Sequence, residues 1–178
     1  MVQGDDLARL ISGCKSGDAV CFSRVVDMYA SRCYGYFYRL TGNSDTSDEL
    51  LSELFVKLVE KIGSYKGGSF ESWLFKIAAN IFHDHLRSKQ RRRKLLEVQQ
   101  EEIESQSTVE PKRSDGELVD RLQAQLGRLD TETRELIMLR FYSQLSFKEM
   151  AQMRSEPIGT TLAKMHRGLK KLRQLMEG

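Results

Sequence analysis

The sequence is poor in prolines and cysteines, and few of its segments alternate as strands do. Only two prolines occur in 178 residues, which leaves long stretches free to form helices. The three cysteines, Cys14, Cys21 and Cys33, are odd in number and lack C-x-x-C spacing, so neither a disulfide framework nor a zinc site is indicated. We therefore expect an all-α fold in which the cysteines pack as small core residues.

Long apolar segments are absent as well. No run approaches the roughly 20 residues that a membrane-spanning helix requires, which argues against membrane insertion. The first ten residues, MVQGDDLARL, lack the basic-then-apolar order of a signal peptide. We therefore expect the protein in the cytoplasm.

A catalytic set of residues is also missing. His83 and His85 stand two residues apart on an expected helix, so they point to different faces. No serine, cysteine or aspartate constellation accompanies them, and no glycine-rich phosphate loop is present. We therefore expect neither a cofactor nor a metal, and an enzyme is kept only as the third of three hypotheses.

Charge is segregated along the chain, although the formal net charge is only +3. Residues 70–94 are mostly basic, residues 97–117 are mostly acidic, and the chain turns basic again after Met153. The acidic part has almost no large apolar residues, and Pro111 and Gly116 stand among its serines, so it cannot build a core. Two basic helical modules joined by an acidic flexible linker predict a protein that binds nucleic acid at two separated places.

The C-terminal segment 146–173 predicts two helices that meet at a sharp turn. Ser146 and Glu149 form a capping box for the first helix, and Pro157 fits the opening of the second. This is the outline of a helix-turn-helix that reads duplex DNA. A solvated amphipathic helix is the alternative, and the capped helix before it favours DNA. The second helix has an apolar stripe of Ile158, Thr161, Met165, Leu169 and Leu172. Its basic side chains fall mostly on other faces: Lys164, Arg167, Lys170, Lys171 and Arg173.

The N-terminal half predicts a further helical module. Residues 22–40 carry apolar and aromatic residues at helical spacing, and Gly42 with Asn43 ends this run. Thr46 and Glu49 have the spacing of a capping box and are expected to begin the next helix. That helix has a wide apolar face and leaves acidic residues toward solvent or a partner.

Aromatic and basic residues come together in the helix after that. A loop at residues 63–68 is followed by Ser69, which caps a helix that carries Trp73 and ends in a basic cluster. Unstacked bases need a flat apolar surface and their backbone needs positive charge, so this combination suits single-stranded nucleic acid. Core packing is the alternative role for Trp73.

Four segments carry a combination of motifs that would rarely coincide by chance. In chain order they are DELLSELFVKLVEKI, FESWLFKIAANIFHDHLRSKQRR, LDTETRELIMLRFYSQLSFKEMAQM and IGTTLAKMHRGLKKLR. Together they resemble the two conserved domains of an extracytoplasmic-function (ECF) sigma factor of bacterial RNA polymerase, over about residues 20–175. The resemblance implies a sigma2-like helical bundle at residues 1–95, a linker at 96–116 and a sigma4-like helix-turn-helix domain at 117–178.

The resemblance also implies roles for individual residues and partners for the chain. The partners are core RNA polymerase, through its beta-prime clamp and beta subunit, promoter DNA, and an anti-sigma factor. The clamp would be held by an acidic surface of Asp48, Glu49 and Glu53, a contact suited to fast docking. The −10 element would be melted and held by Tyr65, Lys66, Ser69, Trp73, Lys76, Asn80, His83 and Arg87. The −35 element would be read as duplex by Thr160, Leu162, Ala163, Lys164 and Arg167.

Several positions depart from the family pattern. Ser52 stands where a glutamine is usual in the clamp-binding helix, and in the C-terminal turn Ser155 replaces a usual glycine and Glu156 a usual apolar residue. Leu162 and Ala163 occupy reading-helix positions that are commonly polar, and neither side chain can hydrogen-bond a base edge.

The departures bear on how the −35 element is read. With Leu162 and Ala163 apolar, Lys164 and Arg167 are left to hold phosphate, and the −35 contact is expected to be less selective or to rely on DNA shape. A sigma-like mimic that captures an anti-sigma factor in place of DNA is therefore the second hypothesis. Such mimics usually carry a receiver domain, for which this chain has no room.

Overall fold

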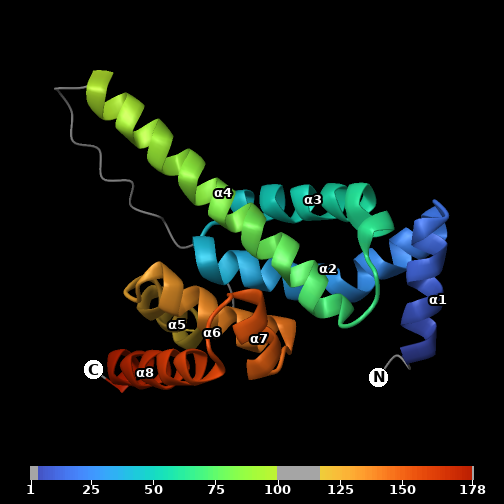
Figure 1. Ribbon diagram of the computed structural model, residues 1–178. Coiled ribbons are helices and arrows are strands. Elements are labelled where there is room, and N and C mark those ends of the chain that lie inside the picture. Colours follow the sequence, from blue (N-terminus) through green and yellow to red (C-terminus); the bar gives the residue numbers. More distant parts are fainter. Residues whose placement is uncertain (1–3, 100–116, 178) are drawn as a thin grey trace.

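The computed structural model describes residues 4–99 and 117–177, and these form two packed groups of helices (Figure 1). The all-α prediction is confirmed, since the described residues contain no β-strand. We call α1–α4 the N-terminal unit and α5–α8 the C-terminal unit. The elements are α1 Gly4–Lys15, α2 Ala19–Thr41, α3 Ser44–Lys61, the 3-10 helix η1 Ile62–Ser64, α4 Phe70–Gln99, α5 Glu117–Gly127, α6 Thr131–Ser143, α7 Phe147–Met153 and α8 Ile158–Glu177.

The core of the N-terminal unit forms where α2, α3 and α4 pack against one another. Tyr36 and Phe75 meet edge to face with ring centroids 5.5 Å apart, a geometry worth about 0.5–1.5 kcal/mol beyond burial. Other side chains that this core buries completely are Phe37, Leu54, Leu58, Leu74 and Phe82. Cys14 and Cys33 are buried too, whereas Cys21 is half-buried.

The turn between α2 and α3 is tighter than the sequence predicts. Gly42 ends α2 in the left-handed region with φ 69°, as expected, and its N–H donates to the Tyr38 carbonyl. The cap of α3, however, is Asn43, whose side chain accepts from the Thr46 N–H at 2.8 Å. The prediction that Thr46 caps α3 was wrong because the chain reverses within two residues, which leaves Thr46 inside the first turn.

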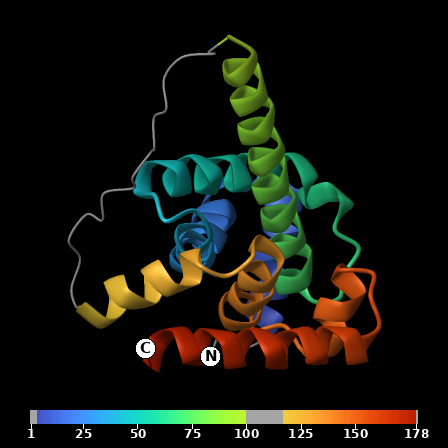
Figure 2. The ribbon, with the colours of Figure 1, turned by 90° about the vertical axis from the view of Figure 1, so that its left-hand side faces the viewer.

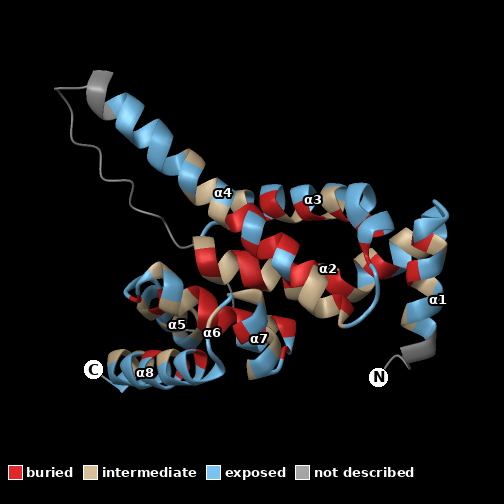
Figure 3. Cartoon of the chain, viewed as in Figure 1, coloured by how far each residue is buried: buried red, intermediate tan, exposed pale blue. Residues whose placement is uncertain are grey.

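Helix α4 has a buried half and an exposed half (Figure 3). Its first part packs in the core, and its end projects away from both units as the exposed stretch 89–96 (Figure 1). The helix continues to Gln99, past the expected linker boundary at 96, because arginine, lysine, leucine and glutamate there are good helix formers. The rest of the predicted linker, residues 100–116, lies outside the described residues.

Helix α6 is the centre of the C-terminal unit. It buries Leu136, Ile137, Met138 and Leu139 in succession, so its middle is covered on all sides. Its neighbours are α2 and α4 of the other unit and α7 and α8 of its own. Figure 2 shows the packing from a second side, with α8 (red) running across the bottom of the molecule below α6.

The predicted helix-turn-helix is formed by α7 and α8. The capping box is confirmed: the Ser146 N–H donates to Glu149 Oε2 at 2.8 Å, and the Glu149 N–H donates to Ser146 Oγ at 3.3 Å. The turn is sharp because Ser155 takes φ 54°, in the left-handed region that glycine usually occupies. Pro157 lies directly before α8, where its missing N–H costs no hydrogen bond.

The two units pack directly on each other through α2 and α6. Gly35 allows this approach, since a Cβ there would lie 2.4 Å from a ring carbon of Tyr142. Arg32 Nε donates to the Tyr142 carbonyl at 2.9 Å, and an Arg134 Nη donates to the Leu40 carbonyl at 3.1 Å. These contacts join residues about a hundred positions apart, which no local pattern in the sequence indicates.

Candidate nucleic-acid interface

Helix α3 presents an acidic face to solvent. It turns Leu50, Leu54 and Leu58 into the core, which places Asp48, Glu49 and Glu53 on the exposed side, as the helical spacing predicts. Within the described residues, none of these three carboxylates forms an ion pair. The face also carries two exposed apolar side chains, Val56 and Val59. It is therefore suited to a partner that offers both cations and apolar surface.

The loop before α4 has a buried anchor at Tyr65. Its side chain is only 8% exposed, its hydroxyl donates to the Gly68 carbonyl at 2.6 Å, and its ring packs on Phe70 and Trp73. Tyr65 therefore shapes the loop, and its part in holding the −10 element stays a prediction. Lys66 is exposed beside it.

Trp73 has one face in this aromatic cluster. It is half-buried, with its ring centroid 5.6 Å from that of Phe70 and 5.4 Å from that of Tyr65. Packing therefore accounts for part of its surface. Ser69 caps α4 as predicted, since its hydroxyl accepts from the Ser72 N–H at 3.1 Å.

Polar residues at helical spacing on α4 line a cavity between the two units. Lys76, Asn80 and His83 share one face of α4, and both Lys76 and Asn80 are exposed. The cavity has a volume of about 550 Å³. Arg87, the remaining predicted residue on α4, lies outside it and pairs with Asp84 at 2.9 Å. The C-terminal unit completes the cavity with Thr131, Glu132, Glu135, Met153, Arg154 and Glu156.

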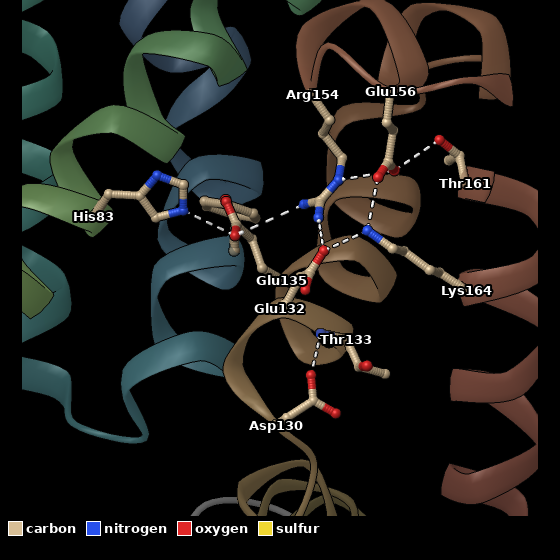
Figure 4. A network of polar contacts seen from close by, with 10 residues as sticks. His83, Asp130, Glu132, Thr133, Glu135, Arg154, Glu156, Thr161 and Lys164 are labelled. Carbon is tan, nitrogen blue, oxygen red and sulfur yellow. Dashed lines mark hydrogen bonds and ion pairs between the residues drawn. The ribbon is translucent and has the colours of Figure 1, made fainter.

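A buried carboxylate joins the two units at this cavity (Figure 4). Glu135 is 4% exposed, and its Oε2 lies 2.9 Å from His83 Nε2 on α4. The Tyr36 hydroxyl donates to Glu135 Oε1 at 3.5 Å, and burial together with this carboxylate raises the pKa of Tyr36 well above its ordinary value. Arg154 Nη1 is 3.9 Å from Glu135. A buried charge requires such partners, so removing one of them is costly.

Lys164, which is predicted to hold phosphate, forms two ion pairs within the C-terminal unit. Its ammonium donates to Glu132 at 2.6 Å and to Glu156 at 2.7 Å (Figure 4). These hydrogen bonds raise the pKa of Lys164, and the bond from Lys164 lowers the pKa of Glu132. Burial alone would raise the pKa of Glu156, but hydrogen bonds from Lys164 and Thr161 outweigh it, so the pKa is lowered. The two carboxylates therefore neutralise the cation.

The outward face of α8 places two apolar side chains, Leu162 and Ala163, among polar ones. Thr160, Leu162, Ala163 and Arg167 are exposed, in agreement with their predicted reading positions, whereas Thr161 is buried against the unit. Other parts of the predicted stripe are less buried than expected, since Ile158 and Leu169 are 49% and 39% exposed. His166, which the sequence analysis did not single out, is exposed on the same face.

Sequence reasoning also missed the acidic and basic partners of this surface. Glu156 was noticed only as a departure in the turn, and Glu132, Glu135 and Arg154 were not noticed at all. Arg154 joins the other three, with contacts of 2.7 Å to Glu132 and 3.2 Å to Glu156. Arg154 and Glu156 lie two positions apart in the turn, but Glu132 and Glu135 are on α6, so no spacing rule could have found the whole cluster.

Two kinds of feature are not found in the part of the chain that the structure describes. No group of three or more His, Cys, Asp or Glu side chains there is arranged to hold a metal ion. None of the helices described is long and apolar enough to cross a membrane.

Two family models match the chain in the order and positions of the two units. Sigma-70 region 2 matches residues 25–92, which include α3, the loop and most of α4. Sigma-70 region 4 matches residues 120–172, which include the helix-turn-helix.

Several curated relatives extend this agreement over nearly the whole chain. It is 31% identical to the ECF RNA polymerase sigma factor BldN of Streptomyces coelicolor over 96% of this chain and 66% of that protein. It is 30% identical to the ECF sigma factor SigE of Mycolicibacterium smegmatis, over 87% of this chain and 61% of that protein. With the ECF sigma factor SigW of Bacillus subtilis it shares 27% identity over 94% of this chain and 95% of the relative. The chain thus spans about two thirds of the first two relatives and nearly all of the third.

Solved structures share the fold at lower identity. The sigma factor RpoE of Bartonella quintana, in complex with the anti-sigma factor NepR, matches with a TM-score of 0.70 and 22% identity over 88% of this chain and 96% of that chain. CnrH, in complex with the cytosolic domain of CnrY, matches with a TM-score of 0.69 and 19% identity over 94% of this chain and 95% of that chain. With both region models in order and relatives of this kind along almost its full length, the chain belongs to the ECF family of RNA polymerase sigma factors.

Proposed function

We propose that the chain works as an alternative sigma factor in the cytoplasm: it binds core RNA polymerase and directs promoter recognition and melting, without catalysis of its own. The observation that carries this proposal is that each matched region exposes a face suited to its task. Region 2 exposes the unpaired acidic face of α3 and the polar face of α4, and region 4 exposes the outward face of α8. We assign core and −10 binding to residues 1–95, and −35 binding to 117–178.

Docking is assigned to α3. Asp48, Glu49 and Glu53 are exposed and unpaired among the described residues, so a basic surface of the polymerase clamp could approach them without breaking an existing contact. Charge complementarity of this kind speeds encounter and fixes register. The beta subunit is the second polymerase contact that we expect.

Strand opening is assigned to Lys66, Lys76 and Asn80, with the loop shaped by Tyr65. The two ammonium groups are exposed and can hold the backbone of an opened strand. Asn80 is an exposed amide in a cavity, and an amide can donate to and accept from the edge of an extruded base. Capturing that base offsets an unstacking cost of a few kcal/mol.

The test is Asn80→Ala in holoenzyme on a promoter found by transcription of a genomic fragment library with purified core polymerase. We expect nearly normal promoter association and reduced permanganate reactivity of unpaired thymines, because the amide acts after docking. Gln90→Ala, an exposed amide on the projecting half of α4, is the matched control. Unchanged reactivity with Asn80→Ala would remove Asn80 from the site.

A sigma-like mimic that captures an anti-sigma factor is the second candidate. It is favoured by the outward face of α8, where Leu162 and Ala163 cannot bond a base edge and Lys164 is neutralised. Tight binding to an anti-sigma domain together with no start sites in the fragment library would decide for the mimic. Specific start sites would decide for the sigma factor, for which an anti-sigma factor is then a partner as well.

A further inference from the structure

The end of α1 contacts the loop that precedes α4. Lys15 Nζ donates to the Tyr65 carbonyl at 2.6 Å, across 50 positions of sequence. The same ammonium lies 5.5 Å from the centroid of the Tyr65 ring, within the range of a cation–π contact. Because α1 also contacts η1, this helix braces the start of the loop.

The backbone that carries Lys15 is held in place by the turn after it. Gly17 takes φ 84°, the left-handed conformation that closes a helix. The Gly17 N–H donates to the Cys14 carbonyl and the Asp18 N–H to the Gly13 carbonyl, both at 3.0 Å. Asp18 then caps α2 by accepting from the Val20 N–H at 2.8 Å. Lys15 is thus attached to a corner fixed by hydrogen bonds on both sides.

The loop itself has few other restraints. Gly67 and Gly68 have φ of 101° and 91°, and a Cβ at either would touch nothing within 4 Å, so no packing holds them. Two hydrogen bonds of Tyr65 hold the loop in place. Its N–H donates to the Ile62 carbonyl at 3.1 Å, and its hydroxyl donates to the Gly68 carbonyl at 2.6 Å. Whatever fixes Tyr65 therefore fixes the loop, and with it the position of Lys66.

We propose that Lys15 is a positioning residue for strand opening: it holds the Tyr65 carbonyl and so sets where the loop presents Lys66 and the half-exposed ring of Trp73. The inference rests on the proposed function. It also extends the functional surface beyond the region 2 match, which begins at residue 25. Lys15 acts through Tyr65 and need not touch DNA.

A direct phosphate contact by Lys15 is the competing explanation, and salt dependence separates the two. A contact to a single strand contributes about 0.7 to the slope of log K against log salt. If Lys15 only positions the loop, its loss lowers affinity for an opened strand but leaves the slope unchanged in a Lys66→Met background, where the phosphate contact of the loop is already absent. If Lys15 holds phosphate, the slope falls in that background too.

The experiment compares Lys15→Met, which keeps the stem and loses the donor, with Lys15→Arg, which keeps donor and charge. Holoenzyme binding to a single-stranded −10 oligonucleotide should weaken about tenfold with Lys15→Met, the value of one charge-assisted hydrogen bond. Lys15→Arg should restore it. Trp73 is the only tryptophan in the chain, so its fluorescence in the free protein reports the loop directly and should change with Lys15→Met but not with Lys15→Arg.

Two further variants keep the test decisive. Lys61→Met, at an exposed lysine near η1, makes the same charge change away from the loop contact and should match the parent. Tyr65→Phe loosens the loop at the Gly68 bond without touching α1 and should give the same defect as Lys15→Met. Parental affinity and fluorescence with Lys15→Met, or a salt slope that falls when Lys15→Met is added to Lys66→Met, would overturn the inference while Asn80→Ala still tests the proposed function. A parent that opens no promoter would overturn both.

Discussion

Releasing Lys164 from its two carboxylates should strengthen the hold of α8 on duplex DNA. Glu132 and Glu156 lie 2.6 Å and 2.7 Å from the ammonium, and replacing both with glutamine keeps their size and oxygen acceptors while removing two charges. The ammonium is then no longer neutralised. It stands on the same helix as the exposed Arg167, so we expect it to reach a phosphate.

The size of the effect follows from counterion release. One added phosphate contact steepens the slope of log K against log salt by about 0.9 for duplex DNA. Between 1 M and 0.1 M salt this amounts to about eightfold in affinity beyond the gain of the parent. The double substitution removes four ion pairs, two of Lys164 and two of the largely buried Arg154, so the melting temperature should fall and binding is measured well below it.

The assay is holoenzyme binding to a −35 duplex by fluorescence anisotropy across a salt series. Lys164→Ala should have little effect in the parent and should cancel the gain in the Glu132→Gln, Glu156→Gln background. Arg167→Ala is the positive control and should lower the slope by about one unit in both. An unchanged slope in the double variant, or a clear loss with Lys164→Ala in the parent, would refute the reasoning.

Buffer pH should not disturb this measurement near neutrality. The hydrogen bond from Lys164 lowers the folded-state pKa of Glu132. For Glu156, burial alone would raise the pKa, but the hydrogen bonds that it accepts outweigh burial, so its pKa is lowered as well. Their stabilising contribution is therefore complete above the ordinary carboxyl range and is lost as pH falls through the lowered values. Because the pKa of Lys164 is raised, the stabilising contribution of its ion pairs is lost only at strongly alkaline pH. A thermal unfolding series should show acid loss of stability in the parent that is smaller in the double variant.

Three further predictions concern the other surfaces. Glu49→Lys combined with Glu53→Lys should weaken assembly with core polymerase at moderate salt while circular dichroism stays unchanged, and parental binding would contradict the docking assignment. Leu162→Arg should add a bidentate donor for guanine and sharpen preference among −35 variants by about 1–3 kcal/mol at one base pair, so a flat preference in a competition assay would contradict the orientation of α8. Gly35→Ala should push against Tyr142 and destabilise the packed units by about 1–3 kcal/mol in chemical unfolding, and a parental midpoint would show that the ring moves aside.

Local chemistry made much of the fold predictable. A capping box needs two residues three positions apart, so Ser146 and Glu149 could be identified without a structure. A left-handed helix end favours glycine, which identified Gly42. Thr46 shows the limit of the same reasoning, because Asn43, three positions earlier, can also cap a helix and the length of the turn decided for it.

The candidate site was less predictable because its decisive contacts join distant parts of the chain. Glu135 lies 52 positions from His83 and 99 from Tyr36, yet it contacts both. Lys164 has the helical position of a phosphate ligand, but a helical pattern cannot show that Glu132, on another helix, neutralises it. The helical periodicity was enough to predict that the α3 and α8 faces are exposed. Which of their charged side chains are ion-paired depends on contacts between helices, so it could be read only from the tertiary structure.

The cavity between the units has a thermodynamic consequence. The face of α4 that carries Lys76 and Asn80 also packs, through His83, on Glu135 of α6. If an opened strand can occupy this face only after the units part, packing of the units and strand capture are linked equilibria, and each disfavours the other by the same factor. The apparent dissociation constant for the strand then equals the intrinsic one divided by the fraction of molecules whose units have parted. Any substitution that weakens the contact of α2 with α6 is therefore expected to raise affinity for opened DNA, even from the far side of the molecule.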